Sequence, residues 1–197
     1  MIIGLTGSIA TGKSTVTHYL LSKGYPVIDS DKIAREVVAK GSSVLEDIVS
    51  AFGLGILQPD GDLDRKALGA IVFSDEEARL QLNEITHPAI NAEMHRQIAY
   101  WEAKGQRLIF CDVPLLFEGD MEENFDEVWV VYVPEEIQVA RLMMRDDIDE
   151  ESAEAKINSQ FSIEDKKEMA DEVIWNDDAL EKTYEQVNKI LMRKVLC

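Results

Sequence analysis

The chain has 197 residues, of which 46% are hydrophobic and 29% are charged, and this balance suits one compact domain with room for an inserted lobe. Its formal net charge of −18 argues against a broad nucleic-acid footprint, which needs a basic stripe to displace counterions. No apolar stretch reaches a membrane-spanning length, and no charged-then-apolar leader precedes Met1. We therefore expect a cytoplasmic protein that binds neither nucleic acid nor a membrane, with a monomer favoured over an oligomer.

Five short apolar runs predict buried strands, and they lie at residues 2–6, 26–29, 108–113, 128–133 and 173–175. Their hydrophobicity is continuous rather than alternating, which is typical of a parallel sheet covered on both faces. Helical patterns lie between the runs, the first over residues 13–23 with Gly24 as its C-terminal cap. The alternation predicts an α/β fold with a five-stranded parallel sheet.

Two segments depart from this rhythm. Residues 33–103 show no strand signal, and a stretch of about seventy residues is too long for one crossover helix, so we expect an inserted helical lobe. Residues 134–167 are dense in charge and poor in large apolar side chains after Met144. That composition favours an exposed, mobile pair of helices.

The stretch "GSIATGKS", from Gly7 to Ser14, fits the phosphate-loop pattern G-x-x-x-x-G-K-[ST] and lies between a predicted strand and a predicted helix. Backbone N–H groups of such a loop surround a β-phosphate, and the helix N-terminus adds partial positive charge. Lys13 can bridge the β- and γ-phosphates, while the Ser14 hydroxyl can ligate Mg²⁺. The expected ATP contacts from this segment are Gly7, Ala10, Thr11, Gly12, Lys13, Ser14 and Thr15.

The second predicted strand ends in the acidic stretch "VIDSDKIAR". Ligands of parallel α/β sheets bind beyond the carboxyl ends of the strands, so Asp29 and Asp31 lie at an edge that can face a γ-phosphate. Kinases of hydroxyl groups need a carboxylate as base, and we assign Asp31, with Asp29 in reserve; helix capping is the alternative for each. Arg35, one turn beyond Asp31, can meet an anionic acceptor or form an ion pair with Asp31.

Arg141 and Arg145 are four residues apart in "PEEIQVARLMMRDD", on one face of a predicted helix. Like charges at this spacing repel mildly unless an anion lies near both. ATP offers adenine for stacking and phosphate oxygens for a second guanidinium, so we expect both arginines to bind it and Arg145 to take up charge during transfer. A surface pair between Arg145 and Asp149 is the alternative.

Three further positions are weaker candidates. Asp112 ends the third predicted strand, where an acid can hold Mg²⁺ or can serve in a turn before Pro114. Glu118 could line an acceptor cleft or cap a helix. His87 precedes Pro88 at an expected helix start, where a structural role is the more common one. The scattered histidines and the unclustered cysteines, Cys111 and Cys197, predict neither a zinc site nor a disulfide framework.

Together these stretches resemble one family, the dephospho-coenzyme A kinases of the P-loop kinase class. The resemblance runs nearly end to end and is carried by "GLTGSIATGKSTV", "VIDSDKIAREVV", "DGDLDRKALGAIVF", "LNEITHPAI", "VPLLFE", "ARLMMRD", "INSQ" and "ADEVIWN". The first motif is shared by many P-loop proteins. The order of the "DGDLDR", "HPAI" and "PLLFE" stretches is far more specific.

The resemblance implies transfer of the ATP γ-phosphoryl group, with Mg²⁺, to the ribose 3′-hydroxyl of dephospho-coenzyme A, which is the last step of coenzyme A biosynthesis. It implies a three-layer nucleotide-binding core of residues 1–32, 104–133 and 168–197, an acceptor-binding helical insert of residues 33–103, and a helical lid of residues 134–167. The acid matching Asp31 lies near the acceptor hydroxyl, and the loop at Asn176 lies beside adenine. His87 and Glu118 help to shape the acceptor site.

The chain departs from the family pattern at Lys156, where an Arg is more usual before "INSQ", and at Asp178, where Gly is frequent. An ammonium cannot make the bidentate phosphate contact of a guanidinium. Rival readings are a nucleoside-monophosphate or other small-molecule kinase, a GTP-dependent switch, and a binding module that has lost activity. The chain contains neither the Asn-Lys-x-Asp nor the Asp-x-x-Gly element of a GTP switch, and Lys13, Ser14 and Asp31 are all present.

Overall fold

The computed structural model describes residues 1–196, and the chain divides into two compact units. Unit 1 comprises Met1–Ile28 and the chain from Trp101 onward, and unit 2 comprises Asp29–Tyr100. None of the helices in the described part of the chain is both long and apolar enough to cross a bilayer.

Unit 1 is built on a parallel sheet whose strands are β1 (Ile2–Thr6), β2 (Val27–Asp29), β3 (Ile109–Asp112), β4 (Glu127–Tyr132) and β5 (Glu172–Trp175). The strand order is β2-β3-β1-β4-β5, with β1 at the centre between β3 and β4. The predicted α/β class and five-stranded parallel sheet are therefore confirmed. Each strand begins and ends within one residue of its apolar run, because burial on both faces requires the whole run to be apolar.

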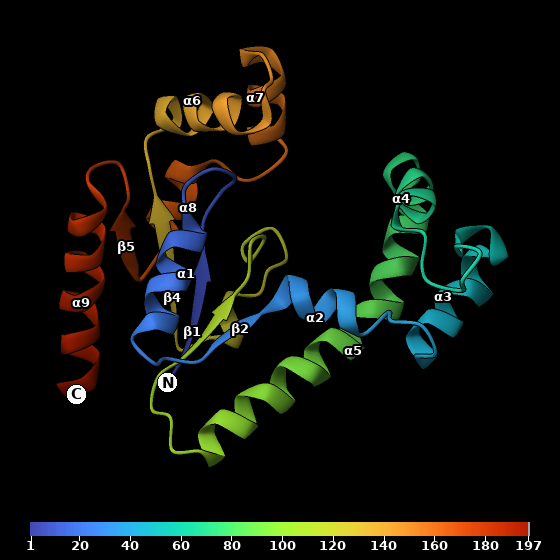
Figure 1. Cartoon of the computed structure of the whole chain (residues 1–197), viewed down its shortest axis with the longest axis horizontal. Coiled ribbons are helices and arrows are strands. Elements are labelled where there is room, and N and C mark those ends of the chain that lie inside the picture. The colour runs from blue at the N-terminus through green and yellow to red at the C-terminus, as the bar shows by residue number, and fades with distance from the viewer. Residues whose placement is uncertain (197) are drawn as a thin grey trace. The chain divides into compact units, whose positions relative to one another are not determined.

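Helices α1 (Lys13–Ser22) and α9 (Leu180–Leu196) cover one face of this sheet in unit 1, and Figure 1 shows both alongside the strands. The other helices of unit 1 are α6 (Glu135–Asp146), α7 (Glu150–Ile157) and α8 (Ile163–Met169). Val16 and Leu20 of α1 and Val187 of α9 pack with the strand residues Phe110 and Trp129 in one core cluster. This core fixes the start of α1 beyond the end of β1.

The other face of the sheet approaches a loop closely at Gly4 in β1. A Cβ atom at this glycine would lie 2.6 Å from the Leu116 side chain and 2.9 Å from the Phe125 ring. The segment between β3 and β4, which includes the short 3-10 helix η2 (Glu122–Asn124), thus packs directly on β1. Helix α8 contacts β4.

Unit 2 continues from the end of β2 as α2 (Ser30–Glu36), α3 (Ser43–Phe52), the 3-10 helix η1 (Leu54–Ile56), α4 (Arg65–Ser74) and α5 (Glu76–Ala103). It has its own apolar cluster, which includes Val38, Ile48, Ile56 and Leu68. Between Ser30 and Tyr100 the structure contains helices and a single isolated antiparallel bridge, between Leu57 and Leu63.

The expected helix start at His87 is wrong. His87 and Pro88 lie inside the continuous helix α5, and His87 is exposed. A proline inside a helix removes one backbone hydrogen bond, but the helix is not ended by it here. The Thr86 hydroxyl donates to the carbonyl of Leu82 at 2.9 Å, a bond within the same stretch of helix.

Candidate active site

The phosphate loop, Gly7–Ser14, joins β1 to α1 and has the backbone form that the motif requires. Gly12 is the N-cap of α1 with φ of 86°, and no side chain caps the helix or places an acid in its first turn. The positive end of the helix is therefore left for an anion. Gly7 is needed for close packing, since a Cβ there would lie 2.7 Å from Thr11 Oγ1 and 2.8 Å from the carbonyl of Val131.

Asp112, at the end of β3, accepts hydrogen bonds from two side chains of α1. Lys13 Nζ pairs with its Oδ1, and Thr17 Oγ1 donates to its Oδ2 at 2.7 Å. The Asp112 residue is only 8% exposed, so its charge is partly removed from water and balanced by Lys13. Asp112 was expected to hold Mg²⁺ or to serve in a turn before Pro114. The structure places its carboxylate beside the phosphate loop. Thr17, one turn after Lys13, was missed because nothing in its local sequence points to β3.

The oxygen ligands near the start of α1 suit a magnesium ion bound together with a nucleotide. Mg²⁺ in such sites takes one or two protein oxygens and completes its shell with phosphate and water. Ser14 offers an exposed hydroxyl in the first turn of α1, and Asp112 offers a carboxylate. No group of three or more His, Cys, Asp or Glu side chains forms a metal cage within residues 1–196.

Asn176 follows β5 and ties that segment to the phosphate loop. Its Nδ2 donates to the Thr11 carbonyl at 2.9 Å, and its Oδ1 accepts from Thr183 Oγ1 of α9 at 3.0 Å. A Cβ at Gly12 would lie 2.1 Å from the same Nδ2. Asn176, expected beside adenine, thus links the phosphate loop to α9 through the two ends of its amide. Thr183 was not predicted, and only its spacing of seven residues from Asn176 hints at the contact.

The two predicted arginines of α6 have different surroundings. Arg141 Nη2 donates to the Asn176 carbonyl at 2.8 Å, and its Nη1 lies 3.8 Å from the position of a Cβ at Gly12. Arg141 therefore lies against the phosphate loop. Arg145 instead donates to its neighbour Asp146, from Nε to Oδ1, at 2.8 Å.

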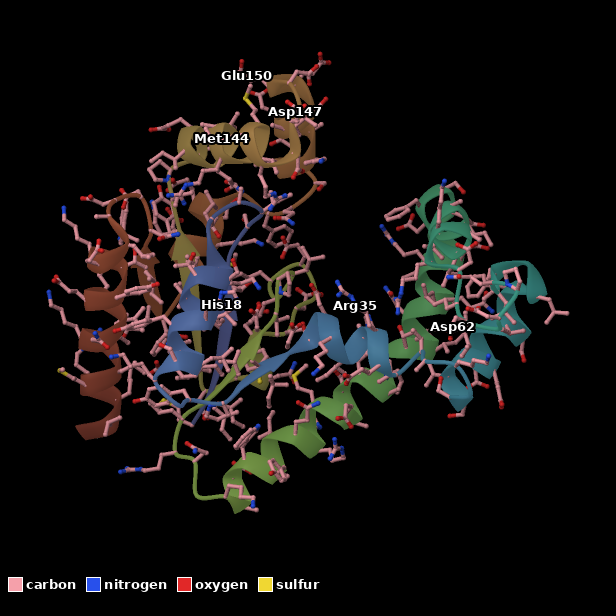
Figure 2. The ribbon with its side chains drawn as sticks, in the orientation of Figure 1. His18, Arg35, Asp62, Met144, Asp147 and Glu150 are labelled. Atoms are coloured by element: carbon pink, nitrogen blue, oxygen red, sulfur yellow. The ribbon has the colours of Figure 1, made fainter. Side chains whose placement is uncertain are left out.

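Asp146 holds a second cation, because Lys156 of α7 donates to its Oδ2 at 2.8 Å. The hydrogen bond from Arg145, with the one from Lys156, lowers the pKa of Asp146 to about 2. The alternative pair of Arg145 with Asp149 is not formed, because Asp149 caps α7 and accepts from the Ser152 N–H at 2.9 Å. Figure 2 shows Asp147 and Glu150 at this junction of α6 and α7.

In unit 2 the two acids of the "DSD" stretch have separate surroundings. Asp29 caps α2 and accepts from the Lys32 N–H at 2.9 Å, as the capping alternative proposed. Asp31 is exposed in the first turn and has no hydrogen-bond partner among the described residues. The ion pair weighed between Asp31 and Arg35 is not formed; Lys32 and Glu36 pair on this helix at 3.7 Å.

Arg35 lines a cavity of about 510 Å³ that lies wholly within unit 2. Arg65 and Lys66 add two further cations to its wall, Asp62 and Asp64 add two acids, and Leu63 adds apolar surface. Figure 2 shows Arg35 on α2 and Asp62 on the loop before α4. The cavity can therefore receive a ligand that has both anionic and apolar parts.

Glu118 is held in unit 1. Its Oε1 accepts from the Phe161 N–H at 3.0 Å and lies 2.7 Å from Lys166 Nζ. The segment before α8 also reaches the phosphate loop, because Gln160 Oε1 accepts from the Ile9 N–H at 2.9 Å. From α6, Gln138 Nε2 donates to the Ile9 carbonyl at 2.7 Å. Neither glutamine was predicted, although Gln160 lies in the quoted "INSQ" stretch.

Comparison with known proteins bears on this geometry. A family profile described as dephospho-CoA kinase matches residues 1–182. Curated proteins named dephospho-CoA kinase from Shouchella clausii and Bacillus cereus are 47% and 48% identical to the chain, covering 98% of it and 98% and 96% of their own lengths.

Two solved structures are also similar to the chain. A dephospho-CoA kinase from Campylobacter jejuni is 35% identical with a TM-score of 0.74, covering 97% of this chain and 95% of its own. A Thermus thermophilus protein is 32% identical with a TM-score of 0.86, covering 98% of this chain and 97% of its own. The chain belongs to the dephospho-CoA kinase family.

Proposed function

We propose that this protein transfers the γ-phosphoryl group of ATP to the ribose 3′-hydroxyl of dephospho-coenzyme A, which gives coenzyme A and ADP. The observation that carries this proposal is a phosphate loop whose Lys13 forms an ion pair with the buried Asp112 of β3. The chain that contains it belongs to the dephospho-CoA kinase family. We place the reaction in the cytoplasm, in a monomer without nucleic-acid or membrane partners.

The nucleotide is bound by the loop and its supports. Backbone N–H groups from Gly7 to Ser14 and the start of α1 surround the phosphates, and Thr15 contributes at the α-phosphate. Lys13 moves from Asp112 to the β- and γ-phosphates, a change of partner between two anions. Ser14 and Asp112 would hold Mg²⁺, which supplies charge neutralisation at the transferred group.

Asp31 is the base in this proposal. Asp29 is occupied as a helix cap, whereas the Asp31 carboxylate has no partner among the described residues and is exposed. An acid in this state can accept the hydrogen bond of a ribose hydroxyl and orient its oxygen for in-line attack. Positioning of the two substrates and stabilisation of charge then supply most of the rate.

The acceptor is bound by the helical insert, residues 33–103, with Arg35 and the cavity of unit 2. The three cations of that cavity suit the diphosphate of dephospho-coenzyme A, and its apolar wall suits the neutral stem. His87 and Glu118 keep their expected role in shaping the acceptor site. Glu118 can do so only through the loop that its hydrogen bond holds.

The lid is the segment of residues 134–167, with the core as the remaining nucleotide-binding part. Arg141 binds ATP from its place at the phosphate loop, and Arg145 leaves Asp146 to take up charge on the transferred group. Lid closure excludes water, which otherwise competes as the acceptor.

A panel of acceptors tests the proposal against the nearest rival, another small-molecule kinase. Purified protein with Mg-ATP is given dephospho-coenzyme A, AMP or shikimate, and ADP release is followed for each. We expect a kcat/KM at least about a hundredfold higher for dephospho-coenzyme A, since a site built to bind a substrate's polar groups rejects compounds that lack them. Equal or higher values with AMP would support the rival.

A further inference from the structure

A buried ion pair joins Glu118 to Lys166, and Lys166 has no part in the substrate contacts above. Lys166 of α8 is 0% exposed, and its Nζ lies 2.7 Å from Glu118 Oε1, in the segment after β3. The neighbouring Lys167 is more open, with 29% of its side chain exposed. Lysine is among the residues that are almost never fully buried without a partner, so Lys166 calls for an explanation.

Stability does not explain the pair. Removing two charges from water is costly, and replacement of a buried ion pair by apolar residues is often neutral or stabilising. This pair is also incompletely satisfied: Glu118 Oε2 and Lys166 Nζ have no well-directed hydrogen bond among the described residues. Apolar side chains at both positions would avoid that cost.

The position of the pair supplies another reason. Glu118 Oε1 also accepts from the Phe161 N–H, at 3.0 Å, so Lys166 and Phe161 share one carboxylate oxygen. The Phe161 carbonyl in turn accepts from Ser8 Oγ at 3.4 Å, and the adjacent Gln160 accepts from the Ile9 N–H at 2.9 Å. A chain of contacts therefore runs from the ion pair through residues 160–161 to the start of the phosphate loop.

Packing reinforces this route. Ile9 and Ala10 of the loop pack against a small apolar cluster of Leu142, Ala153 and Ile157 in α6 and α7. Ala10 has a positive φ of 63°, a conformation that L-residues rarely adopt and that its surroundings must hold in place. The segment that carries Gln160 and Phe161 connects α7 to α8, so fixing it at Glu118 fixes the support of a strained loop.

We propose that Lys166 and Glu118 are positioning residues for phosphoryl transfer. Lys166 fixes the Glu118 carboxylate, Glu118 fixes the Phe161 N–H, and the 160–161 segment fixes Ser8 and Ile9, so that the loop N–H groups are aligned with the phosphates. This role rests on the proposed kinase function for its kinetic consequence, but the loop alignment itself is independent of the acceptor.

The test compares Lys166→Met and Lys166→Arg with a matched control, Lys194→Met. Lys194 of α9 is also a shielded lysine in an ion pair, 2.6 Å from Glu127 and 3.3 Å from Glu172, at the starts of β4 and β5. The Lys194 variant therefore measures the effect of losing a Lys–Glu pair at the N-terminal ends of the strands, away from the phosphate loop. Thermal stability, kcat, the KM for ATP, and hydrogen–deuterium exchange of residues 7–14 are measured for each variant.

We expect both methionine variants to lower the Tm but only Lys166→Met to speed exchange in the phosphate loop and to lower kcat, by about tenfold, because small misplacements at a reacting centre are costly. Lys166→Arg, which keeps the cation, restores most of kcat. The KM for ATP changes less than kcat, because loop contacts with the nucleotide persist.

The proposal is overturned if loop exchange and kcat of Lys166→Met match those of Lys194→Met at equal folded fraction. Failure of the proposed function gives a different pattern, since wild-type protein would then form no coenzyme A. The exchange comparison still decides the alignment role in that case, because it needs no acceptor.

Discussion

The carboxylate of Asp112 at the end of β3 is paired with the ammonium of Lys13 at the start of α1. The Thr17 hydroxyl holds the second carboxylate oxygen at 2.7 Å. The sheet and the first helix thus place opposite charges where the phosphate loop opens. The pair balances both charges, and in the proposed mechanism Lys13 would bind the triphosphate while Asp112 would help to hold Mg²⁺.

Replacing Asp112 with Asn tests this exchange. The variant keeps the shape of the side chain but loses the charge that would hold Mg²⁺, so the Mg²⁺ concentration for half-maximal turnover should rise by about tenfold or more. Asp126→Asn is the control, since Asp126 is another acid of unit 1 that accepts from a backbone N–H, that of Ile2. An unchanged Mg²⁺ requirement in Asp112→Asn would remove Asp112 from the metal site.

Asp31→Asn should lower kcat by about a hundredfold or more and leave the KM for ATP nearly unchanged, because a general base contributes to the transition state. Asp29→Asn is the matched variant two residues earlier. Asn caps helices about as well as Asp, so the cap on the Lys32 N–H is preserved and turnover should change little. Steady-state kinetics with both variants decide the assignment, and a larger loss in Asp29→Asn would reverse it.

Gly12→Ala should raise the KM for ATP by about tenfold or more. The new Cβ would lie 2.1 Å from Asn176 Nδ2 and displace the bond that holds the Thr11 carbonyl. Gly24→Ala is a close control, because Gly24 also has a positive φ, of 85°, but nothing lies within 4 Å of a Cβ there. Both variants pay about 1–2 kcal/mol for the left-handed backbone.

Unfolding measurements and kinetics together separate the two effects of Gly12→Ala. The free energy of unfolding should fall in both glycine variants, while the KM for ATP should rise only in the first. If both variants bind ATP equally well, the contact between Asn176 and the loop has no part in nucleotide binding.

The burial of Cys111 predicts how the stability of the protein changes at alkaline pH. Burial raises the pKa of its thiol from 9.0 to about 12. The unfolded thiol ionises near pH 9 while the folded one keeps its proton, so its contribution to stability is complete below pH 9 and is lost as pH rises from 9 toward 12. Denaturation series at pH 8 to 10.5 should therefore show wild-type stability falling more steeply than that of Cys111→Ala, by up to about 1.4 kcal/mol per pH unit. Equal slopes would mean that the folded thiol ionises normally.

The sheet and the phosphate loop could be predicted because their signals are local. A buried parallel strand must be apolar throughout, and a loop that surrounds phosphate must contain glycines at set positions followed by Lys and Ser. The strands and α1 consequently begin and end close to their predicted limits. Helix α5 was harder to predict, because Pro88 suggests a helix boundary, whereas the folded chain continues as one helix through it.

Partners of charged side chains could not be predicted, because they depend on which elements meet in space. Arg145 had three acids within four residues, Asp146, Asp147 and Asp149, and in the structure it pairs with Asp146 while Asp149 caps α7. Lys166 had no sequence signal that separated it from Lys167, yet only Lys166 is fully buried. Such choices follow from the packing of α6, α7 and α8.

The most direct measurement of the central claim follows one turnover reaction to completion. Purified protein is mixed with Mg-ATP and dephospho-coenzyme A, ADP is counted, and ³¹P NMR locates the new phosphomonoester. We predict equal amounts of ADP and of a phosphate on the ribose 3′-oxygen, and no ADP when the acceptor is omitted. ADP formed without the 3′-phosphate, or a phosphate on another oxygen, would contradict the account.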